Sequence, residues 1–187
     1  MNIKIKYWLV GLAVITEIAC RAAAEAPLTV RSDAAEVTLG WAAKGAVASF
    51  TTREGVELAS GSGGRLFALS FSRQAQPPGE CFTATSADAP SFRAATEEGP
   101  GGASATLTYE GFTQGVACVV CTVRGKPGDP MLRWRITVEM REGWVLEKIQ
   151  YPFVALAAPL GTGLDDDAAV LGASKGGVIR KPGGMKT

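Results

Sequence analysis

Apolar residues beyond residue 27 fall in short runs of about five to nine residues, many of them alternating with polar residues. Clusters of Gly, Pro, Ser and Asp separate these runs, which is the pattern of β-strands joined by turns. No stretch in this part of the chain has the apolar spacing of an amphipathic helix. We expect strands at residues 28–31, 35–41, 46–52, 56–59, 65–72, 81–86, 91–96, 104–110, 116–124, 131–140, 144–150, 168–171 and 177–180.

The run over residues 131–140 is the clearest strand. Its apolar residues, Trp134 among them, alternate with arginine, threonine and glutamate, so one face packs in the core and the other faces solvent. The next run, 144–150, follows residues 141–143, a connection short enough for a β-hairpin. We expect these two strands to pair antiparallel.

The run over residues 116–123 is apolar at successive positions, as in a central strand that is covered on both faces. With the alternating run at 104–110, it favours two stacked antiparallel sheets, an all-β sandwich of the supersandwich type. The Gly- and Pro-rich segments inside the pattern are short enough to be turns within one domain over residues 25–187. Residues 172–187 are rich in Gly and Lys, and we expect the domain to be incomplete at this end.

The N-terminus has the layout of a signal peptide. Two lysines precede an apolar run at 7–15, and an Ala-rich stretch follows at 19–26. Glu17 interrupts the apolar stretch, which makes it a poor membrane span. We expect residues 1–24 to be removed and the protein to be secreted or periplasmic; the alternative is a lipoprotein anchored through Cys20.

Charge and cysteine content exclude several classes of protein. Lys and Arg total 19 and Asp and Glu total 18, so no strong field favours nucleic acid or an anionic membrane. Three cysteines follow the signal peptide, and an odd number allows at most one internal disulfide. Cys118 and Cys121 have the spacing of a redox pair, but residues three apart on a strand point to opposite faces. We interpret both as buried, small apolar side chains.

The chain contains no histidine, which excludes Ser-His and Cys-His nucleophiles and His-ligated zinc. The segment Gly172–Gly176 matches the G-x-S-x-G pattern of a nucleophile elbow. Its Ser174 has no histidine base, and a strand rather than a helix follows, so we interpret the segment as a turn. We therefore expect no catalytic residue, no cofactor and no metal site.

Two kinds of side chain are candidates for sugar binding. Trp41 and Trp144 lie beside glycines at strand margins, so each ring is either an exposed stacking platform or part of edge packing. A run of three carboxylates forms either a solvated turn or a set of acceptors for sugar hydroxyls or calcium. These residues are Asp165, Asp166 and Asp167.

Several short sequence motifs follow one another along the chain. Tyr151-Pro152 follows a strand, a loop with leucine and aspartate follows at 160–167, and Gly-Gly-x-Ile follows at 176–179. In this order the chain resembles the galactose mutarotase-like β-sandwich at the N-terminus of secreted α-galactosidase-like (DUF6259-type) glycoside hydrolases. Further matching words lie at 36–39, 45–50, 66–69 and 132–136.

In that family the catalytic carboxylates belong to a (β/α)₈ barrel further along the polypeptide. The resemblance therefore implies a non-catalytic accessory domain that packs against the barrel, with a loop that reaches the sugar site. The alternatives are a stand-alone carbohydrate-binding protein and a structural β-sandwich of the cell envelope. Their discriminating feature is whether strands and helices alternate in the sequence downstream of residue 187.

Overall fold

The computed structural model places strands where the apolar runs predict them, and it describes residues 27–60, 64–74, 80–156, 168–171 and 177–180. Among these residues no helix is long and apolar enough to cross a membrane. One turn of 3-10 helix, η2 (Ser86–Asp88), lies among the described residues. The strands are β1 (Leu28–Arg31), β2 (Ala35–Gly40), β3 (Ala46–Thr52), β4 (Glu57–Ser60), β5 (Ala68–Arg73), β6 (Phe82–Thr85), β7 (Ser91–Gly99), β8 (Gly102–Glu110), β9 (Val116–Gly125), β10 (Arg133–Met140), β11 (Trp144–Gln150), β12 (Ala168–Leu171) and β13 (Gly177–Arg180).

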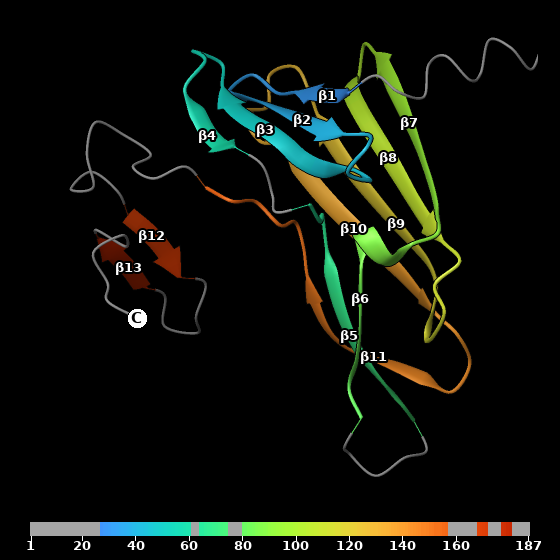
Figure 1. Cartoon of the computed structure of the whole chain (residues 1–187). Coiled ribbons are helices and arrows are strands. Elements are labelled where there is room, and N and C mark those ends of the chain that lie inside the picture. The colour runs from blue at the N-terminus through green and yellow to red at the C-terminus, as the bar shows by residue number, and fades with distance from the viewer. Residues whose placement is uncertain (1–26, 61–63, 75–79, 157–167, 172–176, 181–187) are drawn as a thin grey trace, which may run out of the picture.

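The strands form antiparallel sheets, and two of these sheets stack. The first has the order β1-β2-β3-β4 and the second the order β10-β9-β8-β7. Figure 1 shows β1 to β3, in blue and cyan, crossing in front of β8 to β10, and β1 contacts both β8 and β9. The third sheet, β11-β5-β6, extends from one end of this sandwich, and β12 pairs with β13. The expected all-β sandwich is confirmed.

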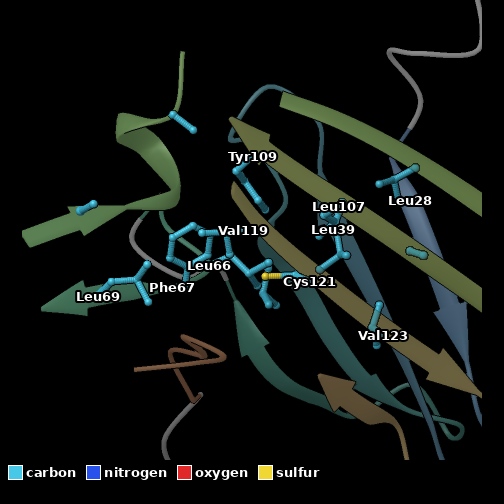
Figure 2. Packing of buried hydrophobic residues seen from close by; sticks show 14 of the residues in the cluster. Leu28, Leu39, Leu66, Phe67, Leu69, Leu107, Tyr109, Val119, Cys121 and Val123 are labelled. Atoms are coloured by element: carbon cyan, nitrogen blue, oxygen red, sulfur yellow. The ribbon is translucent and has the colours of Figure 1, made fainter. Parts of the chain in front are cut away.

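The core lies between the first two sheets because alternate residues of each strand point inward. Val37 and Leu39 of β2 and Leu107 and Val123 of the second sheet are fully or almost fully buried. Figure 2 shows Leu39, Leu107 and Val123 close together, with Phe67 at the end of the group nearest the third sheet. Each such aliphatic side chain contributes about 1.5–3 kcal/mol to stability through its burial.

The segment that leads into the third sheet is held by aromatic packing and by one buried hydroxyl. The rings of Phe67 and Tyr109 meet edge to face with their centroids 5.0 Å apart. The backbone N–H of Leu66 donates to Oγ of Ser86, 2.7 Å away, which satisfies a buried amide. Asp88 accepts hydrogen bonds from both the N–H and the hydroxyl of Thr85 and so fixes the short helix η2.

The predicted hairpin between residues 131–140 and 144–150 is wrong. β10 pairs with β9, whereas β11 crosses to the third sheet and pairs with β5. The connection turns at Gly143, whose φ of 76° suits glycine. Trp144 then packs against Phe71 and Phe82 of the third sheet, and this aromatic contact is lost if β11 stays beside β10.

The expectation that residues 116–123 are covered on both faces is half correct. β9 does lie centrally, between β10 and β8. Its inward residues Val119, Cys121 and Val123 are buried, but the outward residues Val120 and Thr122 are only half-buried. The second sheet therefore has one face in the core and one face that is open among the described residues.

Candidate ligand-binding faces

The outward side chains of β7 to β10 form one polar surface, which we call the outer face. Strand register fixes its composition, because residues directly opposite each other on paired strands share a face. Threonine and serine hydroxyls occupy its middle, and charged residues occupy its ends. From β10 to β7 the four rows read Arg133, Arg124, Ser104 and Glu97; then Arg135, Thr122, Thr106 and Ala95; then Thr137, Val120, Thr108 and Arg93; then Glu139, Cys118, Glu110 and Ser91.

A hollow of about 470 Å³ lies over the outer face, and residues of its first three rows line it. Glu97 is the one carboxylate in its lining among the described residues. The lining thus combines hydroxyls with a net excess of positive charge. Its residues are Glu97, Ser104, Thr106, Val120, Thr122, Arg124, Arg133, Trp134, Arg135 and Thr137.

Arginines gather at the β9–β10 side of the outer face. Arg133 stands directly opposite Arg124, and Arg135 is one row away. Within the described ranges only Arg133 of these three forms an ion pair, with Asp129 at 2.9 Å. A hydrogen bond from the Met131 N–H, followed by the Arg133 guanidinium, lowers the pKa of Asp129. Further along the face, Arg93 is paired with Glu110 at 2.6 Å.

A second hollow, of about 480 Å³, opens beside the third sheet, and we call it the aromatic hollow. Phe71 and Phe112 are almost fully buried, whereas Phe82 is half-buried. Polar side chains surround these three rings. The residues that line the aromatic hollow are Phe71, Phe82, Thr83, Ala84, Asp88, Phe112, Thr113 and Gln114.

The two predicted tryptophans belong to separate aromatic groups. Trp144 is half-buried, and its ring meets Phe82 and Phe71 with centroids 5.2 and 5.5 Å away. It thus backs two rings of the aromatic hollow. The ring of Trp41, also half-buried, tilts against Phe92 at 4.9 Å.

The remaining predicted positions cannot be compared with these two hollows. Asp165, Asp166 and Asp167 lie outside the described residues, as does the Gly172–Gly176 segment. No group of three or more Cys, Asp or Glu residues in the described part of the chain is placed to hold a metal ion.

The positions of the two β9 thiols are set by the alternation of side chains along the strand. Cys118 and Cys121 point to opposite faces of β9, as predicted. The expected burial holds for Cys121, which lies in the core (Figure 2), whereas Cys118 is only half-buried because it faces outward. Burial raises the pKa of Cys121 to about 12 and also raises the pKa of Cys118. Cys81 is exposed, and all three are free thiols. Neither β9 thiol has the lowered pKa of a redox-active cysteine.

No protein-family model, curated protein or solved structure matches this chain. The resemblance to secreted glycosidases therefore stays a prediction carried by short sequence words. A β-sandwich hosts many unrelated functions, so function has to be argued from the two hollows.

The sequence pattern alone predicts neither hollow. Alternation does place Thr and Arg on the solvent side of 104–110 and 131–140, but only strand register brings them into one surface. Phe82 and Trp144 lie far apart in the sequence, and their rings meet because β6 and β11 both pair with β5.

Proposed function

We propose that this chain is a non-catalytic β-sandwich module of a secreted carbohydrate-active enzyme and that it binds a neutral sugar in the aromatic hollow. The observation that carries the proposal is the pairing of aromatic rings with a polar rim in a hollow of about 480 Å³. Ligand sites of this size combine apolar walls with a few polar groups that fix orientation. A sugar ring has apolar C–H faces for the aromatic rings and hydroxyls for the rim.

Phe82 is the ring best placed to meet a ligand. It is half-buried, whereas Phe71 and Phe112 are 2% and 3% exposed and form the floor. The edge-to-face contact with Trp144 holds the Phe82 ring in a fixed orientation. Thr113 and Gln114, which are exposed, supply a hydroxyl and an amide for hydrogen bonds to sugar hydroxyls.

The same residues argue against hydrolysis in the aromatic hollow. A glycosidase needs two carboxyl groups about 5–10 Å apart on either side of the scissile bond. Among the described residues only Asp88 brings a carboxyl group to the lining, and it already accepts two hydrogen bonds from Thr85. The chemistry would then come from the barrel that the resemblance implies, and strand–helix alternation downstream of residue 187 would distinguish this module from a stand-alone binding protein.

Binding to a panel of neutral oligosaccharides that includes galactosides, glucosides and mannosides tests the proposal by isothermal titration calorimetry. Phe82→Leu keeps apolar bulk but removes the ring, and we expect it to weaken binding about two- to tenfold, since stacking contacts are worth about 0.5–1.5 kcal/mol. Trp41→Phe lies outside the aromatic hollow and should leave binding unchanged. No binding across the panel would overturn the proposal and favour a structural sandwich. A loss of binding confined to the Trp41 variant would also overturn it, because the sugar would then bind outside the aromatic hollow.

A further inference from the structure

The outer face carries two arginines directly opposite each other, an arrangement that folding alone does not explain. Arg124 of β9 and Arg133 of β10 are register partners, so their Cβ atoms lie about 4.5–5.5 Å apart on the same face. Like charges directly opposite each other on paired strands destabilise a sheet. Arg135 brings a third guanidinium one row away.

Nearby carboxylates offset only part of this charge. Asp129 pairs with Arg133, and Glu97 lies in the same row but two strands away from Arg124. Arg93 is paired with Glu110 and lies two rows further along the face. The whole chain has a formal net charge of only +1, so the positive charge at this place is local.

We propose that Arg124, Arg133 and Arg135 form an anion site that binds the carboxylates of an acidic polysaccharide, such as a chain of uronic acids. Guanidinium groups bind carboxylates with two parallel hydrogen bonds. The hydroxyls of Ser104, Thr106, Thr122 and Thr137, in the same hollow, are placed to bond sugar hydroxyls.

The dimensions of the outer face favour an elongated ligand over a single small ion. Four strands at about 4.8 Å spacing make it about 14 Å wide. Nucleic acid is disfavoured, because the near-neutral chain lacks the broad positive field that attracts a phosphate backbone. The site itself is independent of the aromatic hollow, but the choice of a polysaccharide as occupant rests on the proposed function.

Calorimetric titration with an oligogalacturonate of defined length, and with its fully methyl-esterified form as the uncharged match, tests the site. We expect the acid to bind, the ester to bind at least tenfold more weakly, and the affinity for the acid to fall as salt is raised. Arg124→Gln and Arg135→Gln should each weaken binding of the acid about tenfold, as expected for a charged hydrogen bond. Arg31→Gln removes an exposed arginine of β1 that is paired with Glu36, and it should change nothing.

A second readout separates binding from a merely structural role. Without ligand, Arg124→Gln should raise the melting temperature by about 1–4 °C, because it removes the repulsion with Arg133. A variant that loses stability and keeps its affinity would overturn the inference. So would tighter binding to duplex DNA or to anionic vesicles than to the oligogalacturonate, or equal binding of inorganic sulfate.

The two proposals fail separately. Phe82→Leu should leave oligogalacturonate binding intact, and the arginine variants should leave neutral sugar binding intact. Acid binding without neutral binding would refute the aromatic hollow alone. Neutral binding without acid binding would refute the arginine site alone.

Discussion

The hydroxyl of Tyr109 is the buried polar group whose removal tests the core most directly. Its ring is fully buried in the second sheet, and its O–H donates to the carbonyl of Lys44 at 2.8 Å. Lys44 has a positive φ of 48° in the turn between β2 and β3. Its ammonium group donates to the carbonyls of Ala87 and Ala89, each 2.7 Å away. This turn is therefore tied both to the second sheet and to the segment around η2.

Tyr109→Phe keeps the ring and removes only the hydroxyl, so the change in apolar burial is small. The Lys44 carbonyl then loses its partner in a largely dry setting, which costs about 1–2 kcal/mol of unfolding free energy. For a domain of this size, about 2–4 °C of melting temperature is lost per kcal/mol. The expected drop is thus about 2–8 °C.

Tyr151→Phe is the matched control. Tyr151 is half-buried, and its O–H donates to the Thr122 carbonyl over a longer distance, 3.3 Å. We expect this variant to lose less than about 1 kcal/mol. Urea unfolding followed by tryptophan fluorescence measures both variants on the same scale. Equal losses for the two, or no loss for Tyr109→Phe, would refute the role assigned to the Lys44 turn.

Three further outcomes are expected. Under native conditions iodoacetamide should label Cys81 within minutes and spare Cys121 until urea unfolds the protein; peptide mapping by mass spectrometry measures this, and early labelling of Cys121 would contradict its burial. The free energy of unfolding should be highest below pH ~8.5 and should fall as the pH rises toward 12, because burial raises the folded-state pKa values of Cys121 and Tyr109. In urea titrations at several pH values, Cys121→Ala should reduce this dependence of stability on pH. Gly45→Ala should lower the free energy of unfolding by more than about 2 kcal/mol, because φ at Gly45 is 79° and the new Cβ would lie 2.7 Å from the Tyr109 hydroxyl. Gly55→Ala is the control, since Gly55 has a φ of 84° with open space around it, and it should cost about 1 kcal/mol. Similar urea midpoints for the two variants would exclude the steric effect.

Strand positions followed from the sequence because alternation is a local property. The β10 strand illustrates this, since each inward residue from Trp134 to Met140 is more buried than its outward neighbour. β7 runs to Gly99, beyond the expected end at residue 96, even though its last residues are polar. It continues because it pairs residue by residue with β8 as far as the turn at Gly99 and Gly102.

Strand pairing could not be predicted from the sequence in the same way, because it depends on contacts between distant segments. The short connection after Met140 favours a hairpin by local rules. Irregularities in pairing at Met140 and after Leu146 let the chain change sheets. The packing of Trp144 against Phe71 and Phe82 then decides which sheet β11 joins. No local pattern contains that information.

Because local patterns do not contain long-range contacts, the sequence predicts only part of each candidate site. Its place beside a glycine at a strand margin made Trp144 a candidate for sugar stacking, and the structure places it behind the rings of the aromatic hollow. The arginines of the outer face were visible only as the polar half of an alternating strand. Their meeting with Arg124 depends on the register between β9 and β10.

The outer face also accounts for the polar residues that lie on only one side of the mostly apolar strand β9. β9 supplies Val119, Cys121 and Val123 to the core, and on its other side Thr122 and Arg124 face outward. A sheet that served only to close the core would gain stability from opposite charges across β9 and β10, yet Arg124 faces Arg133. Selection for folding alone does not favour that pair, whereas an anionic ligand that bridges the two guanidinium groups turns the repulsion into binding energy. Stability and affinity should therefore change in opposite directions at Arg124, and this opposition separates a binding surface from an inert one.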